Sequence, residues 1–590
     1  MYHETIAKFV FVTMQALVPG LAAPLVVSPP GEPYVRGFLP HVSYAHPLCC
    51  TLEGREPPTG DCRLQNGLNK NKMKALKWAQ KTYLKFPIDP VKENFVRPNV
   101  KGAIFSAASP TPLKETSLAC FSSDVFKNIL QLDPAMSSDK TLIDILSGNK
   151  EVPGSTPLAH RYGGHQFGNW AGQLGDGRAH LIGECTDRAG ERWELQLKGS
   201  GKTPYSRFAD GRAVVRSSVR EFLCSEAMHH LGVPTSRAGA LVVSDDTLLR
   251  DPFYDGRPRR ERAAVLLRLA PCWFRFGSLQ MLAADGDEGS LRLLADFVCE
   301  RYYTEAAARE GGRRYSRLVE DVGRRTARLI AAWESVGFTH GVMNTDNMSL
   351  LGLTIDYGPF GFLDRYDPNF ISNSSDSYGV YRFAHQARVG QWNLCRLWEA
   401  LMPVIPEEEH GHIERVLQIY VQEYETHRGE LLSRKLGLNR STSAVKLADR
   451  LLELMLAARA DFTMTFRQLG DVSLEALKAG RVEGLWALPS LTAADGWSDW
   501  LTDLRAEMDR QGLSDAQRRA TAAGANPRYI LRNWLAHEAA EAAERGEFEP
   551  LRQLHTVLSR PFTEQPAAEE AGYAKPPPDW ACTLRVSCSS

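Results

Sequence analysis

The pattern of apolar and polar positions predicts a β-hairpin followed by an amphipathic helix. Residues 179–184 are typical of a strand, residues 187–190 of a turn, and residues 193–198 alternate apolar and polar side chains as a second strand does. Over residues 214–229 the apolar positions have the spacing of one face of a helix. The apolar residues that share a face of this helix are Val215, Val219, Phe222, Leu223 and Ala227.

Helical patterns dominate the C-terminal half of the chain. Residues 265–269 predict one more strand, and a long helix is predicted before residue 340. The apolar stripe of that helix consists of Leu318, Val322, Leu329, Ile330 and Trp333. Residues 393–469 also have amphipathic helical patterns, and the Ala-, Arg- and Glu-rich segment 499–558 is predicted to be helical. Strands early in the chain and helices late in it predict an α+β fold.

The two ends of the chain lack regular patterns. Residues 6–27 are largely apolar, but Lys8, Pro19 and Pro24 interrupt them, whereas a spanning helix needs about 20 apolar residues. We therefore expect no integral membrane span. The stretch up to residue 67 is rich in Pro and Gly, which predicts a loosely ordered leader. Beyond residue 560 the sequence is Pro-rich and predicts an extended tail.

Composition and charge restrict the classes of function. The chain has 590 residues, enough for roughly two to four domain-sized units. Its formal net charge is zero, which argues against a general nucleic-acid binder. The 11 cysteines are scattered, and none has zinc-site partners at the required spacing. A reducing intracellular compartment therefore fits better than a secreted disulfide scaffold.

The segment 340–356 resembles the catalytic loop of a kinase with one part moved. The protein-kinase pattern is H-R-D-x-x-x-x-N, followed by D-F-G, in which the first Asp accepts the substrate proton and the Asn and second Asp hold Mg²⁺. Counting from His340, the Asn position is occupied by Asn347, and Asp356 is the candidate for the metal-binding Asp. Val342 replaces the catalytic Asp, but an Asp occurs at Asp346. The chain keeps the metal-binding residues of this motif, but its candidate for the catalytic base is at position 346 instead of 342.

Upstream elements follow the order found in kinases. A glycine-rich segment, 163–177, precedes the predicted hairpin, as expected of a loop whose backbone N–H groups cover ATP phosphates. Lys198 ends the second strand, and Glu221 on the following helix could pair with it. Tight turns made for packing and ordinary surface charges remain the alternatives for these features.

Two arginines stand in apolar surroundings. Arg268 lies within the predicted strand 265–269, and Arg275 follows it among aromatic residues. Guanidinium groups are rarely buried without a partner. Contacts to phosphate oxygens and structural ion pairs with Asp or Glu are both open for them.

Four blocks of sequence closely resemble the selenoprotein O family of kinase-like protein adenylyltransferases. They are residues 161–177, 194–199, 216–240 and 340–368, and the resemblance extends over residues 86–588. It implies a bilobal protein-kinase-like fold with N- and C-terminal extensions. It also implies transfer of AMP from ATP to Ser, Thr or Tyr hydroxyls of proteins, with ATP bound in an orientation flipped relative to kinases. Animal members imply a mitochondrial location, although the first arginine here is Arg36 and the N-terminus lacks the Arg-rich character of a presequence.

The resemblance also implies roles for individual residues. The implied ATP-binding residues are Gly175, Gly177, Arg178, Lys198, Asp210, Gly211, Arg268, Arg275 and Asp356. Of these, Arg268 and Arg275 would neutralise the terminal phosphate. Glu221 would orient Lys198, and Asp346 would be the proton acceptor. Asn347 and Asp356 would coordinate Mg²⁺ or Mn²⁺.

Taken with the patterns above, the resemblance divides the chain into four parts. These are a leader (1–80), an extension and kinase-like N-lobe (81–265), a helical C-lobe with the catalytic loop (266–500), and a helical extension with a tail (501–590). The last three residues are Cys588, Ser589 and Ser590, where vertebrate members of the family carry a Cys-x-x-Sec sequence. We expect the Pro-rich spacer to keep this tail apart from the active fold, so that deleting residues 582–590 would leave transfer unchanged.

Two other classes of function stay open. One is a phosphotransferase, against which the valine at position 342 argues. The other is a nucleotide-binding scaffold without catalysis, against which Lys198, Asn347 and Asp356 argue.

Overall fold

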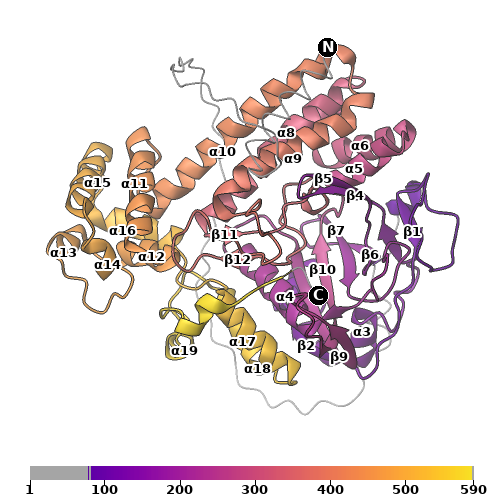
Figure 1. Cartoon of the computed structure of the whole chain (residues 1–590), viewed down its shortest axis with the longest axis horizontal. Helices are drawn as coiled ribbons and strands as arrows, with labels where there is room; N and C mark the ends of the chain where they lie inside the picture. Colours follow the sequence, from indigo (N-terminus) through magenta and orange to yellow (C-terminus); the bar gives the residue numbers. More distant parts are fainter. Residues whose placement is uncertain (1–77, 79–81, 588–590) are drawn as a thin grey trace.

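An antiparallel sheet forms the centre of the N-terminal half of the protein. The computed structural model describes Trp78 and residues 82–587. The strand order is β1-β3-β6-β7-β10-β9-β2, and β8 pairs with β10 (Figure 1). The strands are β1 (Phe105–Ala107), β2 (Ser117–Phe121), β3 (Leu158–His160), β6 (Ala179–Thr186), β7 (Arg192–Lys198), β8 (Ala213–Val214), β9 (Arg237–Arg250) and β10 (Arg259–Ala270). The predicted hairpin is β6–β7, and the prediction of a mixed α and β protein is confirmed.

Both faces of the sheet are buried, which explains the continuous apolar run in β10. Because side chains alternate across a strand, Val265, Leu267 and Leu269 enter one hydrophobic cluster, whereas Leu266 enters another. The register pairs Leu266 with Lys198 and Arg268 with Gln196. Paired residues point to the same face. The strand pairing therefore places Lys198 and Arg268 on one side of the sheet.

Helix α4 (Val215–His230) covers that side of the sheet. The predicted apolar face is buried, but so is most of the rest of the helix. The reason is that α17 (Asn533–Glu544) and α18 (Glu549–Leu558), from the far end of the chain, pack against α4 (Figure 1). The C-terminal extension is therefore part of the same folded body as the sheet.

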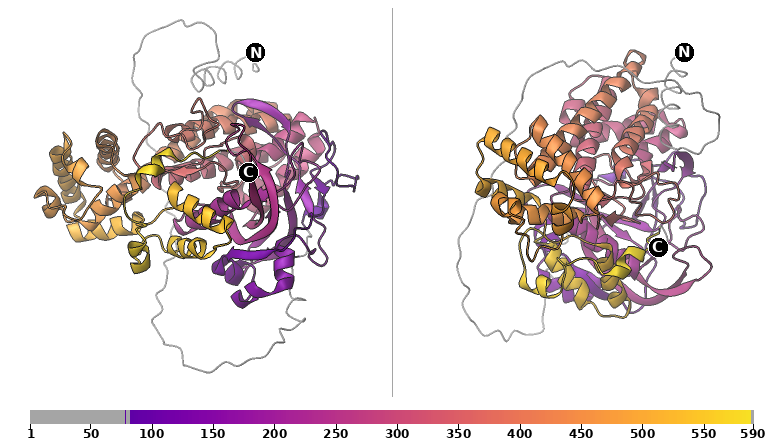
Figure 2. Two further views of the ribbon diagram at one scale, coloured as in Figure 1. Left: turned by 60° about the horizontal axis from the view of Figure 1, so that its bottom comes forward. Right: turned by 60° about the vertical axis from the view of Figure 1, so that its left-hand side comes forward.

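The remaining helices form two groups. The first adjoins the sheet and contains α5 (Phe276–Ala284), α6 (Glu288–Tyr302), α7 (Thr304–Ala307), α8 (Arg313–Ser335), α9 (Gln386–Leu401) and α10 (Ile413–Lys435). The second has a hydrophobic core of its own and projects to one side (Figure 2). It contains α11 (Thr442–Ala458), α12 (Phe462–Asp471), α13 (Leu474–Lys478), α14 (Pro489–Thr492), α15 (Trp497–Gln511) and α16 (Asp515–Ala525).

Several expectations for the elements need revision. Between β2 and β3 the chain forms one short π-helical turn, Val125–Ile129, which is followed by α3 (Lys140–Leu146). The tail is not simply extended, because it contains α19 (Pro566–Glu570) and the 3₁₀ turn Asp579–Thr583. β10 continues past the predicted domain boundary at residue 265.

Two expectations concern the ends of the chain and membranes. Apart from Trp78, the predicted leader lies outside the described residues. Within the described residues, no helix is both long and apolar enough to cross a bilayer.

Candidate active site

The catalytic loop follows helix α8 and is tied to the segment before Asp356. His340 is buried, its Nδ1 accepts from the backbone N–H of Val342, and its Nε2 lies 3.1 Å from the carbonyl oxygen of Ile355. Asn347 donates from its side-chain amide to the carbonyl oxygen of Val342 at 2.9 Å. These bonds fix the 3₁₀ turn Thr345–Asn347, on which Asp346 and Asn347 lie.

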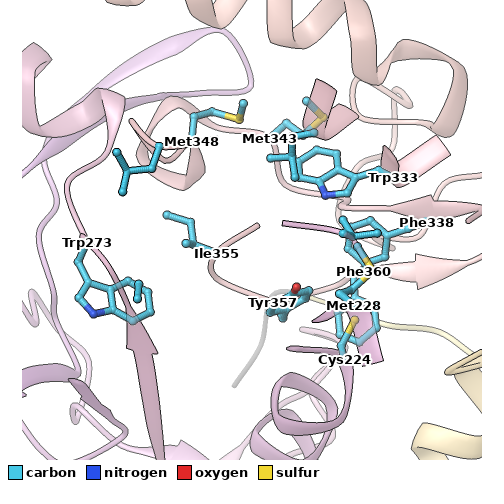
Figure 3. Close-up of a cluster of buried hydrophobic side chains, with 14 of the residues drawn as sticks. Cys224, Met228, Trp273, Trp333, Phe338, Met343, Met348, Ile355, Tyr357 and Phe360 are labelled. Atoms are coloured by element: carbon cyan, nitrogen blue, oxygen red, sulfur yellow. The ribbon is translucent and has the colours of Figure 1, made fainter. Parts of the chain in front are cut away.

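The backbone at Asp356 is held in an unusual conformation. Its φ is 56°, in the left-handed region that costs energy for a residue with a Cβ. Ile355 and Tyr357 on either side are buried, and Figure 3 shows them among Trp273 on one side and Met228 and Cys224 of α4 on the other. Packing of these neighbours therefore holds Asp356 in a strained position, which is typical of functional sites.

Three cations surround the Asp356 carboxylate. Its two oxygens lie 2.5 Å from Arg268 Nη1 and 2.5 Å from Arg275 Nη1, and Lys198 Nζ is 3.4 Å away. Burial by itself would disfavour ionisation, but Arg268, Arg275 and Lys198 outweigh it and hold the pKa of Asp356 well below its usual range. Asp356 is therefore ionised. Of the two roles left open by the sequence, ion pairing and phosphate contact, the structure shows Arg268 and Arg275 in ion pairs.

Glu221 of α4 completes this charge cluster. Its Oε2 lies 2.7 Å from Lys198 Nζ, which is the contact expected of a strand lysine and a helix glutamate, and its Oε1 lies 3.1 Å from Arg268 Nη1. Burial lowers the pKa of Lys198, and Glu221 opposes that effect. Arg268 stacks 4.3 Å from the ring of Trp273. These contacts fix the orientation of both cations.

The cluster opens into a cavity of about 800 Å³, a size suited to a nucleotide. The structure brings ten of the predicted site residues to its wall: Gly175, Gly177, Arg178, Lys198, Asp210, Gly211, Glu221, Arg268, Asn347 and Asp356. Val342 also lines it. Arg275 and Asp346 are not among the lining residues. Arg275 is buried against the Asp356 carboxylate, and the Asp346 carboxylate is covered by Gln166.

Glycines let backbone approach closely at two points of the cavity wall. A Cβ at Gly177 would lie 2.8 Å from the carbonyl oxygen of Tyr205. Gly211 has a φ of 75° and packs on the backbone of Gly201. Asp210, its neighbour, forms an ion pair with Arg250 at 2.7 Å, so its carboxylate has a protein partner.

Sequence reasoning missed several charged residues of this wall, among them Asp176 and Arg220. Asp176 is buried between Gly175 and Gly177 and accepts a hydrogen bond from Gln196 at 2.7 Å. Arg220, directly before Glu221, donates to the carbonyl oxygen of Phe360 at 2.7 Å. Their positions beside predicted site residues were the available signal.

The glycine-rich segment splits into two parts with different positions. Residues 175–178 line the cavity, as predicted. The earlier part instead forms a hairpin of β4 (Gly163–Gln166) and β5 (Asn169–Gln173), which lies on the turn Thr345–Asn347. The backbone N–H of His165 donates to Thr345 Oγ1 at 2.7 Å. The interpretation of the whole segment as one phosphate-covering loop is therefore wrong for its first half.

Asp346 lies beneath this hairpin. It is 7% exposed, its Oδ2 accepts from Gln166 Nε2 at 3.3 Å, and a Cβ added at Gly164 would overlap its carboxylate. Burial raises the pKa of Asp346 to about 6, partly opposed by Arg275. A carboxylate with a pKa near the working pH is suited to accept a proton.

Asn347 and Asp356 fit a divalent cation. Both line the cavity, and the hydrogen bond of Asn347 to Val342 uses its amide nitrogen, not the oxygen that would coordinate a cation. Oxygen ligands are those that Mg²⁺ prefers. In the described part of the chain, no group of three or more His, Cys, Asp or Glu could hold a metal. The other ligands would be phosphate and water oxygens, as is usual for Mg²⁺ in nucleotide sites.

The C-terminal tail reaches the same cavity. Val586 and Ser587 line it, and the carbonyl oxygen of Val586 accepts from the backbone N–H of Ser374 at 2.8 Å. Ser587 bonds to the carbonyl oxygen of Pro252, and Arg585 lies 4.8 Å from the ring of Phe253. The expectation that the tail is separate from the active fold is therefore wrong. Cys588 lies outside the described residues.

Comparison with known families identifies the chain. Residues 98–559 match the model of the family described as protein adenylyltransferase SelO, which is most of the sequence. The chain belongs to this family. The resemblance to selenoprotein O drawn from the motifs is thereby confirmed, and the chain is a member of a nucleotidyltransferase family.

Similar SelO-family proteins are named protein nucleotidyltransferase YdiU. The one from Azoarcus sp. (strain BH72) is 44% identical over 531 residues, covering 88% of this chain and 100% of the relative. That from Methylobacillus flagellatus is 43% identical over 513 residues, covering 85% and 98%. That from Rhodopirellula baltica is 41% identical over 532 residues, covering 85% and 97%. These relatives are bacterial and give the expected mitochondrial location no support.

Proposed function

We propose that this protein transfers AMP from ATP to Ser, Thr or Tyr hydroxyls of other proteins. The observation that carries this proposal is the cavity in which Lys198, Arg268 and Asp356 converge, in a chain of the SelO family. Val342 lines the cavity at the position where a kinase has its catalytic Asp, which disfavours phosphoryl transfer of the kinase type. The presence of Lys198, Asn347 and Asp356 together at the cavity wall disfavours a scaffold without catalysis.

The proposed reaction needs little covalent help from the protein. The acceptor oxygen attacks the α-phosphorus of ATP, the bond to the β-phosphate oxygen breaks, and pyrophosphate leaves. Asp346 takes the proton of the hydroxyl. Arg178, Lys198 and Arg268 balance the charge of the phosphates, since positioning and electrostatic stabilisation supply most of the rate in such transfers. Asn347 and Asp356 would hold Mg²⁺ or Mn²⁺, which neutralises phosphate charge when bound.

Three finer features belong to the same proposal. The sheet with α4 and the helices around α8 would correspond to the two lobes of a kinase. ATP would bind flipped, with its terminal phosphate toward Arg268 and Arg275 and its α-phosphate toward the acceptor. Arg275, behind Asp356, would act through that carboxylate in the ligand-free state. The mitochondrial location stays a prediction.

Labelled ATP tests the proposal directly. The protein is incubated with a mixture of candidate acceptor proteins, Mg²⁺ or Mn²⁺, and ATP labelled at either the α- or the γ-phosphate. Label from the α-position on protein, with release of pyrophosphate, is expected. Label from the γ-position would indicate a kinase, and no label with normal ATP binding would indicate a scaffold. Lys198→Met is the matched negative control, expected to abolish incorporation.

A further inference from the structure

The β4–β5 hairpin borders Asp346 but lies apart from the cavity wall. Gln166, the last residue of β4, contacts the Asp346 carboxylate, and His165 contacts the neighbouring Thr345. The next residue along the chain is Phe167, at the tip of the hairpin. The tip therefore adjoins a residue that contacts Asp346, the group proposed to take the proton from the acceptor hydroxyl.

The turn at this tip holds a bulky residue, Phe167, in a backbone conformation that such residues rarely adopt. Gln166 pairs with Asn169, so Phe167 and Gly168 form a two-residue turn, with φ of 48° and 84°. Two positive φ values define the type I′ turn, for which Asn-Gly is the favoured pair. A bulky aromatic residue in the left-handed region is strained. Phe167 is also 37% exposed, so burial does not fully offset this strain.

Exposed large apolar side chains occur both at the tip and on the segment after the catalytic loop. The ring of Phe167 packs 4.9 Å from that of Tyr381, whose hydroxyl donates to Asn344 Oδ1 at 2.7 Å. Near Tyr381 in the chain, Tyr378 is 77% exposed and Ile371 is 42% exposed. Large apolar residues that stay exposed near a candidate site are typical of a binding surface.

We propose that Phe167 is a specificity-determining residue, which contacts the acceptor polypeptide beside the modified hydroxyl and favours acceptors with a nearby apolar side chain. This inference rests on the proposed adenylyl transfer. The acceptor hydroxyl has to come within hydrogen-bonding distance of Asp346. Gln166, next to Phe167, contacts Asp346, and an extended chain advances about 3.3 Å per residue, so a residue of the acceptor close in sequence to the hydroxyl would reach the hairpin tip. The occupant of this surface is therefore a segment of the acceptor protein.

Synthetic peptides serve as the probe. Nine-residue peptides carry one central Ser, Thr or Tyr, and each of the two positions on either side is set in turn to Leu, Phe, Ser or Glu. Transfer from α-labelled ATP gives kcat/KM for each peptide. The wild type is expected to favour Leu or Phe over Ser by about tenfold at one of these positions, as burial of one apolar side chain permits.

The substitution Phe167→Asn removes the ring and keeps the turn. Asn tolerates positive φ and forms the favoured Asn-Gly turn, so the hairpin is expected to stay folded. The preference for Leu or Phe should fall to within about twofold, with the KM for ATP unchanged, whereas Phe167→Tyr should retain it. Leu456→Ser on α11, where the side chain is 46% exposed, is the matched control and should change neither quantity.

The outcomes separate this inference from the proposed function. Transfer of α-label by the wild type with no apolar preference, or with a preference that Phe167→Asn preserves, would overturn the inference and leave the function intact. A change of oligomeric state in Phe167→Asn, with peptide preference preserved, would assign the surface to a second copy of the chain instead. Absence of α-label transfer to any peptide or protein would overturn both.

Discussion

At the residue scale, one carboxylate organises the charges of the site. Asp356 pairs with Arg268 and Arg275 and lies near Lys198, all within a buried cluster. Buried charges are tolerated only when they are paired. Bound phosphates and a divalent ion would exchange partners within this cluster, because the cation would compete with the arginines for Asp356 and the phosphates would compete with Asp356 for the arginines.

Arg268 should therefore contribute directly to nucleotide binding. Arg268 lines the cavity, whereas Arg275 does not. In Arg268→Ala, binding of ATP should weaken by about 1.5–3 kcal/mol, the usual value of a charge-assisted hydrogen bond, and binding of AMP should weaken much less. Isothermal titration with both nucleotides measures this. Arg257→Ala, an exposed arginine, is the control. Equal losses for ATP and AMP would show that Arg268 acts only through Asp356.

Gly164 should be required for the position of Asp346. A Cβ at Gly164 would overlap the Asp346 carboxylate, so Gly164→Ala should displace the proposed base. Transfer should fall by about 10²–10⁴-fold, the usual contribution of a general base, while ATP binding is retained. Gly524→Ala is the control, since nothing lies within 4 Å of a Cβ there. Normal transfer in Gly164→Ala would remove Asp346 from that role.

At the element scale, helices α8 and α10 meet around a largely buried carboxyl group, Glu334, whose side chain is 11% exposed. The hydroxyl of Tyr424 on α10 donates to Glu334 Oε2 at 2.6 Å, and Arg428 Nε is 3.9 Å away. Burial raises the pKa of Glu334 from 4.5 to about 7, against the opposing effects of Tyr424 and Arg428. Between these two values the folded protein binds a proton that the unfolded chain has released.

This shift predicts a pH-dependent difference in stability. The contribution of Glu334 is fully present below pH 4.5 and is lost as the pH rises through 7. Relative to Glu334→Gln, which cannot ionise, the wild type should therefore lose about 2–3 kcal/mol of unfolding free energy between pH 5 and pH 8. Urea unfolding at both pH values measures it, with the exposed Glu425→Gln as control. A constant difference across this range would contradict the burial of an ionisable Glu334.

At the scale of the whole molecule, the C-terminal tail contributes to the wall of the cavity proposed to bind ATP. The path from α17 and α18 beside α4 to Val586 at the cavity makes the C-terminal extension part of the site. Contacts of Ser587 with Pro252 and of Val586 with Ser374 hold the tail at this position. The tail is thus placed to affect entry and retention of the nucleotide.

Removal of residues 586–590 should weaken ATP binding. The deletion takes away two residues that line the cavity, and the loss of their contacts should raise the Kd for ATP by about threefold to tenfold under reducing conditions. Cys582→Ser serves as control, because Cys582 is exposed and is not among the lining residues. An unchanged Kd in the truncated protein would show that the tail only covers the cavity and does not contribute to binding.

Local sequence determined the elements and most residue types of the site. The periods of β6, β7, α4 and α8 could be predicted because an element's apolar face repeats every two or 3.6 residues. The pairing of Lys198 with Glu221 could be predicted because a strand lysine followed by a helix glutamate occurs in the same order in kinases. The family could be recognised from four blocks of this one sequence, without the structure.

Only the tertiary structure decided which of these residues share the cavity. The hairpin β4–β5 lies on Asp346, Arg275 lies behind Asp356, and Val586 returns to the nucleotide cavity. Each of these contacts joins residues far apart in the chain. Such contacts depend on strand register and on the packing of distant helices, neither of which leaves a periodic signal in the local sequence.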